Sequence, residues 1–225
     1  MKKYFNEEWG GTEGNYIHSY TKDEKTYNDF SKETTWFIAY KELAEGGERT
    51  DAFLDFIAES VGDGIGDTAY SPHNIEAYTY LPDVFFNYNE ADTAWKYMQY
   101  IYSVKDEPHE ISVQGTNGNY PEIPFTFVSH TITGMMGVEP NAPKNAVSTV
   151  ARLPQGVGYV KASDIKMGDH VLSVRHDGLT DSTVTNTSSK DLTWTVQFYG
   201  EHDYIKAGDK VYKAERSEIN GDAIS

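Results

Sequence analysis

Hydrophobic side chains recur at helical spacing through the first 140 residues of the chain. Trp36, Phe37, Tyr40 and Leu43 follow this spacing, and a Gly46-Gly47 pair ends their run. Similar apolar runs follow, separated by Gly-rich or polar segments. The pattern predicts helices over residues 31–45, 51–61, 73–86, 91–104 and 121–136.

The more apolar of these helices begin near residues 31, 73 and 121, each after a turn or loop. Units of two helices that repeat every roughly 40–50 residues are typical of a helical solenoid or toroid. The sequences of the units differ, so the repeat is one of structure only. About two and a half helical hairpins fit before residue 140.

The pattern changes after Pro140-Asn141-Ala142-Pro143, where β-branched residues begin to alternate with polar ones. Five or more short runs of this kind, separated by Gly-Asp and Asp-Gly turns, predict a small antiparallel β-sandwich. The sequence therefore predicts a mainly α protein with a β domain. Its parts are a helical-hairpin domain over residues 1–140 and a β domain over residues 141–225.

Charge narrows the classes of partner. The chain has 225 residues, 19 basic and 35 acidic side chains, a formal net charge of −16 and no cysteine. Such a surface repels phosphate backbones and anionic lipid, which argues against nucleic acid and membrane partners. We expect a soluble protein, because the chain start lacks the apolar core of a signal peptide and no apolar run could span a bilayer. The compartment stays open.

Three stretches of sequence resemble a known enzyme class. They are Tyr120-Pro121-Glu122-Ile123, the Gly134–Pro140 segment with its glycine, aliphatic, acidic, proline turn, and the Gly168–Val171 turn. Their order resembles the last inner helix and terminal β domain of bacterial six-hairpin glycoside hydrolases, relatives of the rhamnosidase and trehalase-like enzymes. The resemblance implies a partial (α/α) six-hairpin toroid, carbohydrate as the substrate, and no cofactor. It also implies that part of the toroid is absent: either the chain is a fragment, or a second copy or a partner chain completes the toroid.

The resemblance places an active cleft at the N-terminal ends of the inner helices, where each predicted helix carries a glutamate. Glycoside hydrolysis needs two carboxyl groups across the scissile bond, and sugar rings commonly stack on aromatic side chains. Glu122 and Glu76 are the candidate catalytic carboxylates, with acid and base unassigned. The candidate substrate-binding residues are Tyr70, His73, Trp36, Tyr120 and Glu33.

Each candidate also has a structural explanation. A glutamate in the first helical turn is favoured by capping and by the helix dipole, which is the preferred interpretation of Glu33. Asp83 is typical of a buried structural partner, and His130 of a satisfied core histidine. The remaining histidines lack metal-ligand spacing, so no histidine-based metal site is expected, and a calcium site built from carboxylates stays open.

Two other functions stay open. One is a non-catalytic module that binds glycan or another protein. The other is an α/α-toroid polysaccharide lyase, against which the acidic charge argues because lyase substrates are themselves acidic.

Overall fold

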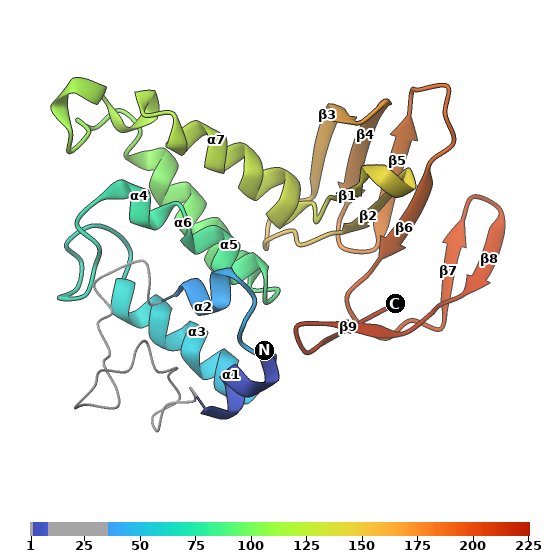
Figure 1. Ribbon diagram of the computed structural model, residues 1–225, viewed down its shortest axis with the longest axis horizontal. Coiled ribbons are helices and arrows are strands. Elements are labelled where there is room, and N and C mark those ends of the chain that lie inside the picture. Colours follow the sequence, from blue (N-terminus) through green and yellow to red (C-terminus); the bar gives the residue numbers. More distant parts are fainter. Residues whose placement is uncertain (1, 9–35) are drawn as a thin grey trace. The chain divides into compact units, whose positions relative to one another are not determined.

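The computed structural model describes residues 2–8 and 36–225, and the chain forms two compact units, residues 1–128 and 129–225. The first unit is helical and the second is built of short strands (Figure 1). No helix of the described residues is long and apolar enough to cross a membrane.

The helical unit consists of short helices joined by irregular segments. In chain order they are α1 (Lys2–Glu8), α2 (Phe37–Tyr40), α3 (Glu48–Val61), α4 (Ile75–Tyr78), α5 (Leu81–Phe86), α6 (Ala91–Ser103) and α7 (Glu122–Ser129), with single 3₁₀ turns η2 (Ser112–Gln114) and η3 (Asn117–Asn119) between α6 and α7.

The core of the helical unit forms where α5 and α6 pack against each other. Phe85 stacks on Tyr97 with ring centroids 5.6 Å apart, and both rings are buried. The Tyr97 hydroxyl donates to the Gly62 carbonyl, and this bond ties α6 to the end of α3. Buried aromatic contacts of this kind contribute both apolar area and specific geometry.

The prediction of a mainly α fold with a partial six-hairpin toroid is wrong. Within the described residues, helices account for 36% and strands for 27%, and no helical toroid is evident. The predicted helix over 73–86 is interrupted at Thr79-Tyr80, before Pro82 in the first turn of α5, so it forms the two short helices α4 and α5. Because this hairpin is not a pair of long helices, the resemblance to six-hairpin glycosidases falls, and so does the reason to expect a chain that completes the ring.

Predictions for individual helices fared better. The predicted helices over 51–61 and 91–104 correspond to α3 and α6, each with its apolar face buried. The last predicted helix, over 121–136, is α7 followed by a π-helical turn η4 (His130–Met135). Pro124 fits α7 because it lies in the first turn, where its missing N–H has no helical partner.

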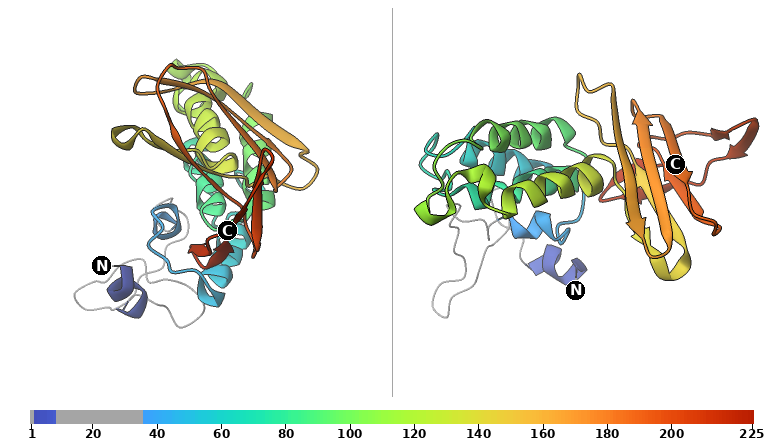
Figure 2. Two further views of the ribbon diagram at one scale, coloured as in Figure 1. Left: turned by 90° about the vertical axis from the view of Figure 1, so that its right-hand side faces the viewer. Right: turned by 90° about the horizontal axis from the view of Figure 1, so that it is seen from above.

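The β unit contains four small sheets. Its strands are β1 (Glu139–Asn141), β2 (Ala146–Val150), β3 (Tyr159–Met167), β4 (His170–Asp177), β5 (Asp181–Asn186), β6 (Thr193–Gln197), β7 (Tyr204–Ala207), β8 (Lys210–Lys213), β9 (Ser217–Ile219) and β10 (Asp222–Ile224), with a 3₁₀ turn η5 (Ala142–Lys144) before β2. The sheets are β1-β2-β6, β3-β4-β5, β7-β8 and β9-β10. Both views of Figure 2 show β3, β4 and β5 next to one another, in orange.

The prediction of an antiparallel β-sandwich is wrong as well. β2 pairs with β6 in parallel, from Ala146 opposite Thr193 to Val150 opposite Gln197. The β3-β4-β5 sheet is the connection that allows this parallel pairing, since parallel neighbours need a long crossover. Alternation of apolar and polar residues identifies a strand but leaves the direction of its neighbour undetermined.

A buried histidine connects the sheet to the turn that precedes it. His176 is fully buried, and its Nε2 donates to the Met136 carbonyl at 3.0 Å. Its Nδ1 lies 2.7 Å from the Ser182 hydroxyl, which therefore donates to the ring. Burial lowers the pKa of His176 below its ordinary value of 6.5, and the Met136 contact and Asp177 oppose this only in part.

The β unit should therefore lose stability in mild acid. Below pH 6.5 the unfolded chain takes up a proton at His176 that the folded chain takes up only at lower pH, so the free energy of unfolding falls as the pH decreases. The slope approaches about 1.4 kcal/mol per pH unit for this single proton. Urea unfolding of the full chain between pH 7 and 5 measures it. His176→Gln should remove this part of the slope, whereas the exposed His73→Gln should leave it; equal slopes in wild type and His176→Gln would contradict the assignment.

Candidate functional site

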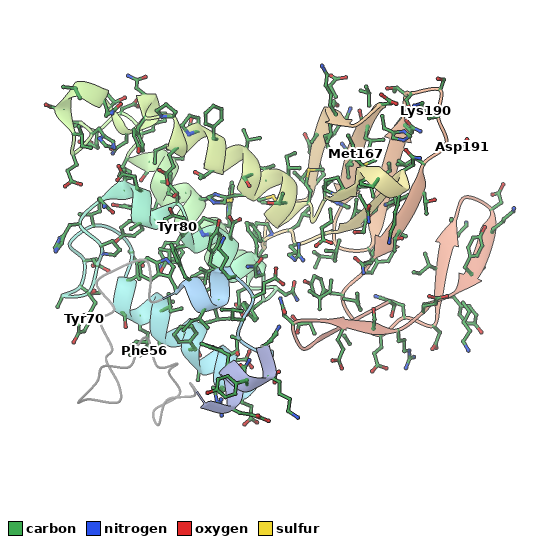
Figure 3. All side chains as sticks on the ribbon, viewed as in Figure 1. Phe56, Tyr70, Tyr80, Met167, Lys190 and Asp191 are labelled. Carbon is green, nitrogen blue, oxygen red and sulfur yellow. The ribbon has the colours of Figure 1, made fainter. Side chains whose placement is uncertain are left out.

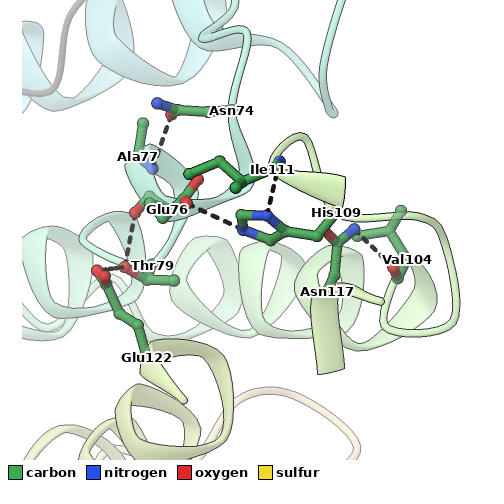
Figure 4. A network of polar contacts seen from close by, with 9 residues as sticks. All are labelled: Asn74, Glu76, Ala77, Thr79, Val104, His109, Ile111, Asn117 and Glu122. Carbon is green, nitrogen blue, oxygen red and sulfur yellow. Dashed lines mark hydrogen bonds and ion pairs between the residues drawn. The ribbon is translucent and has the colours of Figure 1, made fainter. Parts of the chain in front are cut away.

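Glu76 and His109 form a hydrogen-bonded pair in the helical unit. Glu76 Oε1 lies 3.0 Å from His109 Nε2, and the His109 side chain is completely buried (Figure 4). The backbone N–H of Ile111 donates to His109 Nδ1 at 3.0 Å, so Nδ1 is an acceptor. The neutral ring therefore carries its proton on Nε2 and donates it to the glutamate. The bond from Ile111 thus fixes the tautomer of His109, and the bond from Nε2 fixes the position of the Glu76 carboxylate.

Local structure places both members of the pair. Asn74 caps α4 by accepting from the Ala77 N–H, which sets Glu76 in the single turn of this helix. His109 lies on the connection between α6 and α7. Asn117 anchors this connection by donating from its side chain to the Val104 carbonyl at 2.9 Å and from its backbone to the Glu107 carbonyl at 3.0 Å. The end of α6 therefore determines where His109 lies.

Thr79 links the pair to Glu122. Its buried hydroxyl lies 2.6 Å from the Glu76 carbonyl oxygen and 3.2 Å from Glu122 Oε1. The Thr79 hydroxyl has one proton, which it donates mainly to the closer Glu76 carbonyl. Its hydrogen bond to Glu122 is therefore the weaker of the two. Glu122 is half-buried in the first turn of α7 and keeps acceptor capacity for another hydroxyl or N–H group.

Tyr120 lies beside the same pair. Its ring centroid is 4.6 Å from that of His109, with the ring planes tilted by 34°. Tyr120 is half-buried and precedes α7 by two residues, so one short segment supplies both an aromatic ring and the Glu122 carboxylate. The structure thus brings together three predicted site residues, Glu76, Tyr120 and Glu122.

The other predicted residues lie elsewhere. Tyr70 is 52% exposed at the outer edge of the helical unit, whereas Tyr80 lies within it (Figure 3). His73 is exposed, and Trp36 is a core side chain at 1% exposure, which leaves it no surface for a sugar. Among the described residues, no hydrogen bond joins Tyr70, His73 or Trp36 to the Glu76–Glu122 cluster. Glu33 lies outside the described residues.

Sequence reasoning missed His109, the buried member of the cluster. It lies 33 positions after Glu76 in a polar loop, with no periodic or metal-ligand spacing to mark it. Thr79 was missed for a similar reason, because a threonine between two aromatic residues of an apolar stretch is unremarkable. His109 and Thr79 join the cluster only through contacts with residues 33 to 43 positions away in the sequence.

One oxygen of the cluster has no hydrogen bond within residues 2–8 and 36–225. Glu76 Oε2 is buried, while the side chain as a whole is 21% exposed. An unsatisfied buried acceptor costs about 1–3 kcal/mol, and no donor within the described residues offsets this cost at Oε2. Two carboxylates with spare acceptor capacity, next to an aromatic ring, suit a ligand rich in hydroxyl groups.

The cluster contains no candidate metal centre. Within the part of the chain that the structure describes, no group of three or more His, Asp or Glu side chains could hold a metal ion. The cluster offers carboxyl groups, an imidazole and an aromatic hydroxyl for chemistry.

Comparison of the whole chain with protein-family models and with curated proteins finds no match to either.

Proposed function

We propose that the chain hydrolyses glycosidic bonds of an oligo- or polysaccharide at the cluster of Glu76, Thr79, His109, Tyr120 and Glu122. The observation that supports this most is the link through Thr79, which joins carboxylate-bearing residues of α4 and α7 in one hydrogen-bonded group. Hydrolysis of a glycoside by carboxyl groups needs two of them, one to protonate the leaving oxygen and one to activate water or attack carbon.

The other members of the cluster have supporting roles in this proposal. His109 holds the Glu76 carboxylate in one orientation, and Thr79 positions Glu122. Tyr120 offers a ring to the apolar face of a sugar. Glu122 is the carboxyl that contacts the substrate first, because it has the weaker internal partner. The acid and the base stay unassigned between Glu76 and Glu122.

The experiment is a hydrolysis screen of the full chain against aryl glycosides and plant and bacterial oligosaccharides. Glu122→Gln and Glu76→Gln should each lower kcat by about 100-fold or more, because the amides keep the shape and lose the proton transfer. Glu59→Gln on the exposed face of α3 is the matched control and should retain full activity. Circular dichroism establishes that each variant is folded. Absence of turnover on every substrate, or a fully active Glu122→Gln, would contradict the proposal.

A second function is favoured by the burial of the Glu76–His109 pair. Since Oε1 of Glu76 is already bonded and His109 is completely buried, the pair also serves to hold the 106–120 loop against α4. A module that binds glycan without hydrolysing it would use the cluster in this way. Isothermal titration with the same oligosaccharides separates the two functions: binding without turnover in the wild type supports the module, and turnover supports the hydrolase.

A further inference from the structure

A preformed apolar pocket lies between the end of α6 and the start of α7. Its volume is ≈ 260 Å³, and its lining includes Tyr102, Lys105, Gly118, Ile123, Pro124 and Phe127. The rings of Tyr102 and Phe127 lie 6.2 Å apart and 47° from parallel, so they present two faces to the same space. None of these side chains takes part in the hydrogen bonds of the Glu76–Glu122 cluster.

The floor of the pocket is held by backbone hydrogen bonds. Gly118 N–H donates to the Lys105 carbonyl at 2.7 Å, and Asn117 holds the Val104 carbonyl beside it. A Cβ added at Gly118 would lie 3.0 Å from the Lys105 carbonyl oxygen, so the chain passes close to the segment that follows α6. The pocket therefore exists without a ligand, which reduces the entropic cost of binding.

Size and lining select the ligand. An apolar cavity of about 150 Å³ is enough to hold benzene in a protein interior. The larger volume here accommodates one or two fused aromatic rings, and aromatic pairs prefer the offset or edge-to-face contacts that two tilted rings provide. A sugar ring fits poorly, because the lining offers few polar groups for its hydroxyls.

Charge near the pocket gives an anionic ligand little advantage. The Lys105 ammonium lies 5.0 Å from the centre of the Tyr102 ring, but it already forms an ion pair with Asp106. Among the lining residues Lys105 alone is charged, and the chain as a whole carries a formal net charge of −16 that repels anions. An uncharged ring gains the apolar contacts without this repulsion.

We propose that this pocket binds an uncharged aromatic ring and, resting on the proposed function, that the ring is the aglycone of the glycoside cleaved at the neighbouring cluster. One segment, residues 118–127, carries Tyr120 and Glu122 as well as four residues of the pocket lining. A substrate with a sugar at the cluster and an aryl group in the pocket would contact residues of this one segment at both sites. The substrate class is thus an aryl glycoside.

Binding of the ring alone tests the pocket independently of hydrolysis. Ligand-observed NMR titration of the full chain with 2-naphthol should show saturable binding, whereas 2-naphthoate should bind less tightly. Tyr102→Ala should weaken 2-naphthol binding about 5-fold, in keeping with the value of an aromatic pair. The control is Phe125→Ala, an aromatic on α7 that is 73% exposed and outside the pocket lining, as against 60% exposure for Tyr102. Absence of binding, or equal weakening in both variants, would overturn the pocket assignment.

Kinetics then test the aglycone role. The ratio of kcat/KM for phenyl and methyl glycosides should fall about 5-fold in Tyr102→Ala and stay constant in Phe125→Ala, because the intrinsic leaving-group difference cancels. Binding of 2-naphthol without hydrolysis of any glycoside would support the pocket assignment and contradict the proposed hydrolase. Hydrolysis with an unchanged ratio in Tyr102→Ala would contradict the aglycone role of the pocket and support the proposed hydrolase.

Discussion

Replacing Gly137 with alanine is expected to destabilise the β unit by about 3–5 kcal/mol. Gly137 follows the π-helical turn η4, and its φ is +53°, in the left-handed region that favours glycine. An added Cβ would lie 2.3 Å from the Val150 carbonyl oxygen and 2.6 Å from Val150 Cγ1. The first of these atoms belongs to the backbone of β2 and has little freedom to move.

The cost has two sources, which a matched control separates. Gly178 also has a positive φ, +66°, but a Cβ there would meet nothing within 4 Å. Gly178→Ala should therefore cost only the backbone strain, about 1 kcal/mol, and the excess in Gly137→Ala measures the collision with β2. Urea unfolding of the full chain, followed through methyl resonances of Leu172 and Val174 in the core of the β unit, gives both values. Equal destabilisation by the two variants would contradict a close approach at Gly137.

Hydrophobic periodicity predicted the helices whose packing follows it. The apolar faces of α3 and α6 recur at helical spacing over 14 and 13 residues, and both helices form where expected. Periodicity failed over residues 73–86, where almost every side is apolar. Such a stretch has no polar face that would orient one long helix on the core. The chain forms the two short helices α4 and α5 instead.

The toroid was inferred from the spacing of helix starts, and spacing alone does not determine how helices pair. Irregular segments such as residues 62–74 occupy length that a toroid would fill with helix. The parallel pairing of β2 with β6 could not be predicted either, because alternating residues such as Val147–Val150 suit a parallel and an antiparallel neighbour equally.

The candidate site was predictable in part. Glu76, Glu122 and Tyr120 were recognised because each lies at a predicted helix start, and the structure places them in one cluster. His109 and Thr79 were not recognised, since a loop residue and an unremarkable threonine carry no local pattern. Their contribution depends on Asn117, which fixes the loop on α6.

Replacing Asp83 with asparagine is expected to stabilise the helical unit at pH 8, by up to about 4 kcal/mol. Asp83 lies in the first turn of α5 and is half-buried. Burial raises the pKa of Asp83 from its ordinary value of 3.8 to about 7, and the nearby Lys41 only partly opposes this. The free energy that corresponds to this difference is the cost of ionising the carboxyl group within the fold.

The pH dependence follows from the direction of this change. Between pH 3.8 and about 7 the folded chain binds a proton at Asp83 that the unfolded chain has lost, so stability falls as the pH rises through this range. Above pH 7 both states are ionised and the cost is complete. Asparagine has the same shape without the charge, so the difference between the variant and the wild type should be small at pH 4 and largest at pH 8.

Urea unfolding of the full chain at several pH values, followed by circular dichroism, measures this difference. Asp55→Asn on the exposed face of α3 is the control and should change stability by less than about 0.5 kcal/mol at any pH. A stabilisation by Asp83→Asn that is independent of pH would point to a packing effect, and a loss of stability at pH 8 would show that the ionised carboxylate has compensating partners. A gain that grows from pH 4 to pH 8 would establish that ionisation of the half-buried Asp83 carboxyl group costs stability in the folded chain.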